Sequence, residues 1–167
     1  MACPFFMPIE KLETGAWPHA SRLPLAGGWS GHCTAPGHDG EIPALLVLEK
    51  SCNLGYSADC DWLPRDRRFD AVRFAVSARR KEPSTIGRTL RVKYVCERGN
   101  RPVEHGMLDF DIITSTWTQP HGDARIQKMA ECFLSTYLAK QQSALADQAE
   151  RSDQTLPSEA LQQEDEL

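Results

Sequence analysis

Residues 90–97 read Leu-Arg-Val-Lys-Tyr-Val-Cys-Glu, a stretch in which apolar and polar side chains alternate with a period of two. Such alternation predicts a β-strand with one face in a core and the other toward solvent. The pattern recurs on both sides, over residues 69–79 and 108–113. Turn-forming residues separate the three segments, at 82–84 and at 98–102. The sequence therefore predicts a three-stranded antiparallel β-meander over residues 69–117.

A helix is predicted directly after the meander, over residues 123–141. Pro120 and Gly122 end the preceding strand, and Asp123 is a favourable N-cap because its carboxylate accepts a hydrogen bond from a backbone N–H of the first turn. Apolar residues then follow at the spacing of one helical face; they are Ile126, Met129, Ala130, Phe133, Leu134 and Tyr137. We expect this amphipathic helix to pack on the open face of the sheet, which gives the α+β fold class.

The composition changes beyond residue 141. Residues 142–167 contain seven acidic residues against a single basic one, Arg151, and few large apolar side chains. Such a segment cannot bury enough apolar surface to offset the entropy lost on ordering. We therefore expect a frayed helix that leads into an acidic, largely disordered tail, and a single α+β domain over residues 1–141.

The first 65 residues are predicted to be largely irregular. Residues 1–40 are rich in Pro, Gly, His and Trp and follow neither a strand period nor a helix period. A short helix is predicted over residues 42–51, with Pro43 in its first turn, where a missing N–H costs nothing, and with its end near residues 53–55. A long segment with so little regular structure needs some other means of ordering.

The six cysteines are expected to be reduced thiols. The N-terminus has no basic region followed by an apolar stretch, and the longest apolar run, 44–48, is far shorter than the roughly 20 residues of a membrane-spanning helix. The sequence thus predicts a cytoplasmic protein with no membrane contact, a compartment that disfavours disulfides. Cys96 and Cys132 fall on or beside predicted apolar faces and are interpreted as core residues.

The four remaining cysteines all lie within residues 1–65: Cys3, Cys33, Cys52 and Cys60. Four thiolates suit zinc or an iron–sulfur cluster, and they argue against magnesium or calcium. The gaps between them are 29, 18 and 7 residues, whereas structural zinc sites usually pair cysteines about two to four residues apart. We therefore predict a cysteine-ligated iron–sulfur cluster, of the [4Fe–4S] type, with a redox, sensing or structural role.

Two alternatives at the cysteines stay open. A structural zinc site could use His32 or His38 in place of Cys3, which gives three thiolates and one imidazole. His32, next to Cys33, could also donate an N–H to a cluster sulfur. In the second alternative the four cysteines are scattered small hydrophobic residues, one of them redox-active.

Four segments of the chain resemble an uncharacterised family of small bacterial proteins. They are residues 3–8 (Cys-Pro-Phe-Phe-Met-Pro), 31–33 (Gly-His-Cys), 52–56 (Cys-Asn-Leu-Gly-Tyr) with Cys60, and 125–132 (Arg-Ile-Gln-Lys-Met-Ala-Glu-Cys). The resemblance extends over roughly residues 1–140. It implies that the cysteine segments act together, and it implies no reaction or partner.

A metal-free interaction module is the alternative function of a different class. Residues 65–101 contain twelve basic and four acidic residues, so their surface could bind nucleic acid. Arg73, Arg91 and Lys93, however, share the polar face of the predicted sheet with Asp109 and Asp111, and opposite charges on adjacent strands commonly pair. The partner favoured by the sequence is therefore an unidentified protein or redox partner.

No enzymatic activity is assigned from the sequence. A serine nucleophile elbow, a phosphate-binding Gly-rich loop and a dinucleotide fingerprint each require a fixed motif, and none of these motifs occurs.

Overall fold

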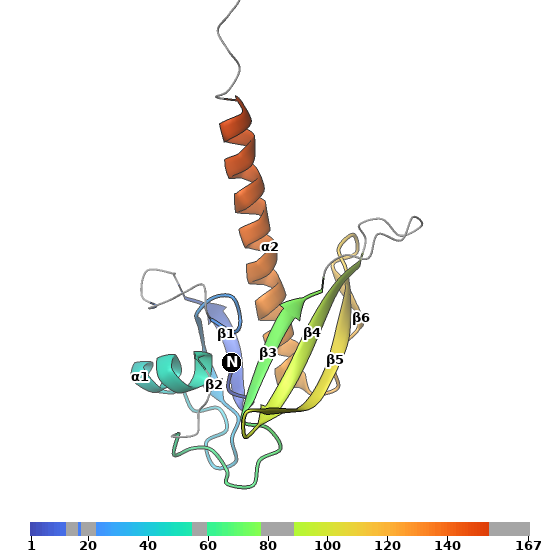
Figure 1. Ribbon diagram of the computed structural model, residues 1–167. Helices are drawn as coiled ribbons and strands as arrows, with labels where there is room; N and C mark the ends of the chain where they lie inside the picture. Colours follow the sequence, from blue (N-terminus) through green and yellow to red (C-terminus); the bar gives the residue numbers. More distant parts are fainter. Residues whose placement is uncertain (13–16, 18–22, 55–59, 78–88, 154–167) are drawn as a thin grey trace, which may run out of the picture. The chain divides into compact units, whose positions relative to one another are not determined.

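The computed structural model describes residues 1–12, 17, 23–54, 60–77 and 89–153. These residues form two antiparallel sheets, a short helix and a long C-terminal helix, as Figure 1 shows. The fold class is therefore α+β, as predicted. The chain divides into two units, Met1–Thr136 and Tyr137–Leu167.

The larger sheet has four strands in sequential order: β3 (Ala71–Val76), β4 (Thr89–Arg98), β5 (Arg101–Asp111) and β6 (Thr116–Gln119). The first three are the predicted meander. Its register places Val92 opposite Val76 on one side and Leu108 on the other. The prediction of only three strands was wrong, since the sheet has a fourth strand, β6. Its four residues are too few and lack the alternating pattern that would predict a strand. Its Trp117 ring instead meets the Phe110 ring at a centroid distance of 5.2 Å.

The first part of helix α2 (Ala124–Asp153) packs on this sheet through its apolar face. Ile126 and Met129 are fully buried, and the Phe133 ring stacks on Phe74 of β3 at 5.8 Å. The carboxylate of Asp123 accepts a hydrogen bond of 2.9 Å from the backbone N–H of Arg125, which confirms the predicted N-cap.

Helix α2 continues farther than the predicted end at residue 141. Residues 142–153, expected to begin the acidic tail, are helical. Side chains from Ala139 to Arg151 are exposed, so this part of the helix is not ordered by burial within its own unit. The predicted disordered part, from residue 154 onward, lies outside the described residues.

The N-terminal segment contains a second sheet that the sequence did not predict. Strand β1 (Phe6–Lys11) pairs antiparallel with β2 (Trp29–Cys33), so the expectation of an irregular segment over residues 1–40 was wrong. Pro8 and Gly31 face each other in this pairing and interrupt the side-chain alternation of both strands, which conceals them from a pattern search.

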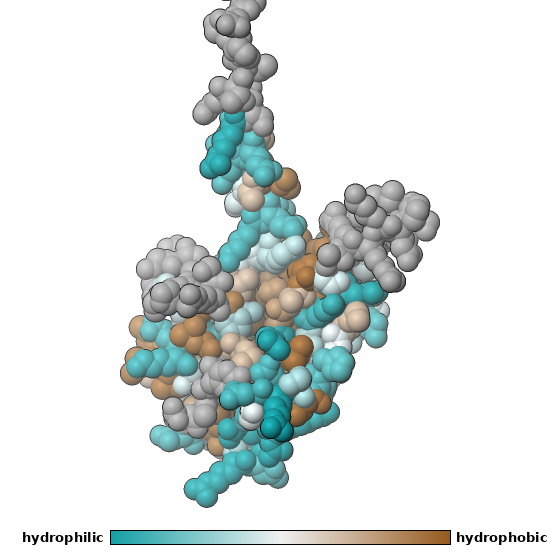
Figure 2. Space-filling view, in the orientation of Figure 1, coloured by the Kyte–Doolittle hydropathy of each residue, from teal (hydrophilic) through white to brown (hydrophobic). Residues whose placement is uncertain are grey.

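The predicted short helix is present, in an unusual form. Helix α1 (Leu45–Val47) runs directly into a π-helix, η3 (Leu48–Asn53), in which the N–H of Leu54 bonds to the carbonyl of Glu49 at 3.3 Å. π-helical turns are rare and occur frequently at functional sites. Figure 2 shows apolar surface where α1 lies, and Leu45 and Leu46 are both exposed there.

The N-terminal residues connect the two sheets, and the N-terminus lies between them in Figure 1. Ala2 pairs with Val72 at the free edge of β3 through two backbone hydrogen bonds of 2.7 and 2.9 Å. Residue 3 is thereby held beside the larger sheet.

Candidate metal centre

Cys3 and Cys52 are joined through their backbones. The N–H of Cys3 donates to the carbonyl of Cys52 at 3.0 Å, while Ala2, one residue earlier, is paired with β3. Cys52 itself lies in η3, where both Leu48 and Cys52 are buried. Two cysteines 49 positions apart are thus brought side by side by hydrogen bonds that involve no side chain.

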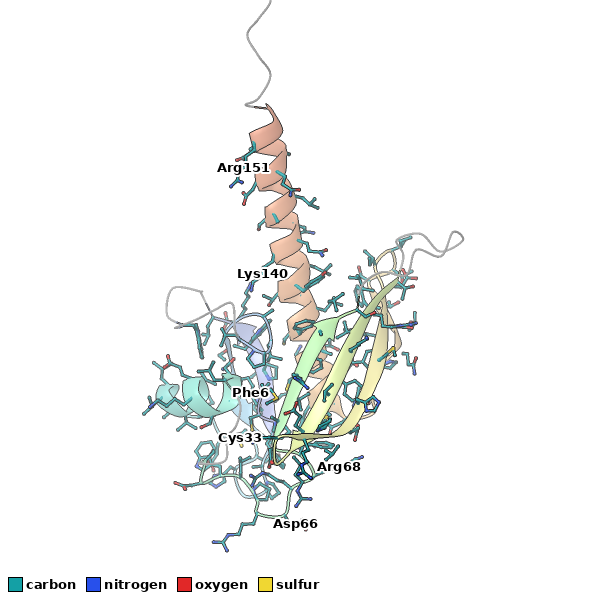
Figure 3. All side chains as sticks on the ribbon, in the orientation of Figure 1. Phe6, Cys33, Asp66, Arg68, Lys140 and Arg151 are labelled. Atoms are coloured by element: carbon teal, nitrogen blue, oxygen red, sulfur yellow. The ribbon has the colours of Figure 1, made fainter. Side chains whose placement is uncertain are left out.

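Cys33 lies at the end of β2, opposite Phe6 of β1, and Figure 3 shows the two residues close together. Its N–H donates to the carbonyl of Glu41 at 2.8 Å, and its carbonyl accepts from Gly40 at 2.9 Å. Its sulfur also accepts a hydrogen bond from the N–H of Ala35 at 3.4 Å. This last contact is a backbone donor aimed at a candidate ligand atom.

Cys60 affects the pKa of two of the other cysteines through its negative charge. Burial is the main cause that raises the pKa of Cys52, and negative charge on Cys3, Cys60 and Cys33 raises it further. Burial also raises the pKa of Cys33, with a further contribution from the charge of Cys60 against the lowering effect of the Ala35 N–H. The charges of Cys3, Cys60 and Cys33 therefore oppose ionisation of Cys52, and the charge of Cys60 opposes ionisation of Cys33.

The four differ in exposure. Cys3, Cys33 and Cys52 are buried, with exposed fractions of 5%, 8% and 7%, whereas Cys60 is half-buried. All six cysteines of the chain lie within the described part, and all are free thiols. Within that same part, no group of three or more His, Cys, Asp or Glu side chains is arranged around a single ion position. Charge acts over a longer range than direct coordination, so the electrostatic effect of one thiol on another does not require their sulfurs to surround one ion.

Asn53 positions the cysteine segments, a role that no sequence pattern indicated. Its side chain is 1% exposed. The amide oxygen accepts from the N–H of Trp29 at 3.0 Å, and the amide nitrogen donates to the carbonyls of Trp29 and Leu48 at 2.9 and 3.2 Å. Asn53 therefore fastens η3, which carries Cys52, to β2, which carries Cys33. A pattern search reads an Asn at this point as a helix end.

One candidate histidine, His32, lies on the strand face opposite Cys33, and the other, His38, contacts residues other than the cysteines. In β2 the buried face holds Trp29, Gly31 and Cys33, so strand alternation directs His32 to the opposite face. His38 stacks on Trp62 at 4.6 Å and contacts the Glu41 carboxylate at 3.2 Å through Nδ1. Neither placement favours a histidine as a replacement for Cys3.

Cys96 and Cys132 belong to the core, as predicted. Their exposed fractions are 0% and 3%, and burial is the main cause that raises the pKa of each to about 12. A buried thiol of this kind stays protonated and unreactive.

Part of the basic segment is paired within the fold. Four of its arginines form ion pairs with carboxylates: Arg67 with Asp70 at 2.7 Å, Arg68 with Glu104 at 2.6 Å, Arg73 with Glu97 at 2.9 Å, and Arg91 with Asp109 at 2.8 Å. Asp111, expected on the polar face, is instead 7% exposed and accepts hydrogen bonds from the N–H groups of Ile113 and Thr114. Residues 79–81 and 88, also basic, lie outside the described residues.

Comparisons with family models, with curated protein sequences and with solved structures found no match to this chain. The resemblance to small bacterial proteins stays a prediction. Across the described residues, no helix is long and apolar enough to cross a membrane.

Proposed function

We propose that Cys3, Cys33, Cys52 and Cys60 bind an iron–sulfur cluster of the [4Fe–4S] type. The observation that carries the proposal is the backbone hydrogen bond of 3.0 Å from Cys3 to Cys52, together with the buried Asn53 amide that links η3, which holds Cys52, to β2, which holds Cys33. The two cysteines that serve as core residues, Cys96 and Cys132, belong to β4 and α2.

The protonation state of these thiols supports the same proposal. Burial and mutual repulsion hold Cys52 in its protonated form, because several thiolates close together would repel one another. A bound metal centre reverses this balance, since its positive charge replaces the protons and stabilises all four thiolates. Metal binding to this set is therefore expected to release protons and to strengthen with rising pH.

Two features favour a cluster over zinc. The ligands are widely dispersed in the sequence, without the short Cys-x-x-Cys spacing of structural zinc sites. In addition, the Ala35 N–H donates to the Cys33 sulfur, and N–H to sulfur bonds are among the features that set cluster potentials.

The proposed centre has a structural role by its connectivity alone. It would join the segment before β1, the end of β2, η3 and the segment around Cys60, which also share a two-stranded sheet, the Cys3–Cys52 bond and the Asn53 contacts. A redox role is the further expectation, and Cys60, the least buried ligand, marks the side nearest to solvent.

Anaerobic purification followed by iron, sulfide and zinc analysis tests the proposal. We expect about four iron and four sulfide per chain, with a brown colour that bleaches on oxidation. Stoichiometric zinc without sulfide would identify the site as structural zinc, and metal-free protein would overturn metal binding altogether.

Matched variants identify the ligands. Cys52→Ser and Cys60→Ser should each lose most of the bound iron, while Cys96→Ser, a thiol of the same chain in the core, should retain it. Equal iron in all three variants would contradict the ligand assignment.

A further inference from the structure

Two buried polar groups have no hydrogen-bond partner, the indole N–H of Trp29 and the hydroxyl of Thr136. Trp29, the first residue of β2, is 7% exposed, and Thr136 of α2 is 1% exposed. Within the part of the chain that the structure describes, neither Nε1 of Trp29 nor Oγ1 of Thr136 has a partner. Burial of a polar group without a partner is unfavourable, and native proteins contain few such groups. Both groups are therefore available to hydrogen-bond a ligand.

Gly27 lies between Thr136 and a lysine, Lys11. A Cβ built at this glycine would lie 3.4 Å from Cε of Lys11 and 3.6 Å from Oγ1 of Thr136. Lys11 is also the partner of Trp29 in the pairing of β1 with β2, and directly paired residues extend their side chains from the same face of a sheet. The ammonium, the indole and the hydroxyl thus lie on one side of the small sheet, around a residue that has no side chain.

The three side chains share one chemical property, since each can donate a hydrogen bond and none of these donors is used. The ammonium of Lys11 is exposed and makes no ion pair or hydrogen bond with a described residue. Ammonium and indole groups are donors only, and the threonine hydroxyl can donate as well. A ligand that satisfies all three must supply several acceptor atoms, and the lysine favours a negative charge on it.

We propose that Lys11, Trp29 and Thr136 bind a phosphate group, with Gly27 leaving room for one of its oxygens. A phosphate presents at least three acceptor oxygens that point in different directions, so donors from β1, β2 and α2 can each bond to a different oxygen. A carboxylate presents only two oxygens in one plane. Lysine commonly binds phosphate as a point charge.

The site is separate from the cysteines. It contains none of the four candidate ligands and does not depend on a bound metal. Its residues all belong to the unit Met1–Thr136. The exposed lysine marks the side from which the ligand enters, whereas the indole and the hydroxyl form the buried end.

Titration of the full chain with inorganic phosphate at constant ionic strength tests the proposal. The indole N–H signals are followed by proton–nitrogen correlation spectroscopy, and the Trp29 signal is assigned from its loss in Trp29→Phe. This signal should shift in a saturable way, while the signals of Trp62 and Trp117 should stay in place. Absence of a saturable Trp29 shift would overturn the site. A parallel titration with acetate should require at least tenfold higher concentrations, and equal or tighter binding of acetate would overturn phosphate as the ligand.

Thr136→Val distinguishes a binding role from a merely unpaired hydroxyl. The substitution keeps the shape of the side chain and removes the hydroxyl, so in phosphate-free buffer the variant should be at least as stable as the wild type. Its affinity for phosphate should nevertheless fall about tenfold, because a hydrogen bond to a charged group is lost. Equal phosphate affinity in the variant and the wild type would overturn the role of Thr136.

Gly27→Ala tests the space beside the donors. The added Cβ would meet Lys11 and Thr136 at ordinary contact distances, so the variant should fold, while the methyl group occupies the position of a phosphate oxygen. We expect it to lose phosphate binding, and Lys11→Gln to bind about tenfold more weakly. Lys50→Gln, at an exposed lysine of η3, is the matched control and should bind as the wild type does. The same affinity in Gly27→Ala, Lys11→Gln and Lys50→Gln would overturn the proposal.

Discussion

The N-terminal cysteine region and the four-stranded sheet are held together in different ways. Strands β3 to β6 follow one another in sequence, and each pairs with its neighbour through a ladder of backbone hydrogen bonds, with single register shifts at Cys96/Glu97 and Asp109/Phe110. In the cysteine region, β1 and β2 form only a small sheet. The remaining segments are held together by single contacts between residues that are distant in the sequence. Examples are the bond from Cys3 to Cys52 and the three bonds of Asn53.

The comparison teaches which region depends on a few residues. A ladder shares its stabilisation among many equivalent bonds, so the loss of one side chain is a small part of the total. The N-terminal region depends on a few groups instead, among them the buried amide of Asn53, so the loss of one of them is a larger part of the total. The predictions below test this difference.

Removal of the proposed cluster should produce the largest difference between the two regions. Treatment of the cluster-loaded protein with an iron chelator and oxidant should abolish hydrogen-exchange protection in β1, β2 and η3. The ladders of β3 to β5 should stay protected, because they contain none of the four cysteines. Simultaneous loss of protection in both regions would show that they unfold as one unit.

Gly31→Ala should destabilise the N-terminal sheet. A Cβ at this position would lie 2.2 Å from the carbonyl oxygen of Met7 and 2.7 Å from the Phe6 ring, and one of these contacts is with backbone. We expect a loss of about 3 kcal/mol in the free energy of unfolding, measured by urea denaturation. Gly122→Ala is the control, because a Cβ there meets open space. Similar losses in both variants would contradict the steric explanation.

Asn53→Leu should weaken the attachment of η3 to β2. The substitution keeps a similar volume but leaves the Trp29 N–H and two carbonyls without their partner. The expected loss in unfolding free energy is about 2 kcal/mol. Gln141→Leu, which removes a hydrogen bond on an exposed stretch of helix, should change stability little. A neutral Asn53→Leu variant would show that its hydrogen bonds do not hold the region.

Because of Cys96, the free energy of unfolding should fall as the pH rises through the alkaline range. Its pKa is about 12 in the folded chain and about 8.5 in an unfolded one, so the unfolded state loses its proton first. The stabilisation is complete below about pH 8.5 and is lost progressively as the pH rises toward 12. Stability curves of the wild type and Cys96→Ala should differ by a constant offset at neutral pH and converge above pH 8.5. Parallel curves throughout would contradict the shift.

The ion pair of Arg91 and Asp109 should contribute least. It forms two hydrogen bonds of 2.8 and 3.0 Å across β4 and β5, but the arginine side chain is 49% exposed. A double-mutant cycle with Arg91→Ala and Asp109→Ala should give a coupling free energy of about 0.5 kcal/mol. A coupling several times larger would show that the sheet, too, depends on single side-chain contacts.

The sequence by itself determined the three long strands, the start of α2 at Asp123 and the core positions of Cys96 and Cys132. Each of these is encoded by neighbouring residues, through a period of two, a capping side chain or a helical stripe. The four cysteines could be selected by elimination, although the backbone contact of Cys3 with Cys52 could not be derived, because spacing in sequence does not specify distance in space.

Only the tertiary structure decided the rest. The pairing of β1 with β2, the added strand β6, the buried amide of Asn53 and the placement of Arg125 beside Phe5 each depend on residues that are far apart in the sequence or on patterns too short to recognise. Strand alternation also separated His32 from Cys33, although the two are adjacent in the sequence. Local chemistry is encoded residue by residue, whereas contacts between distant segments arise only when the whole chain packs.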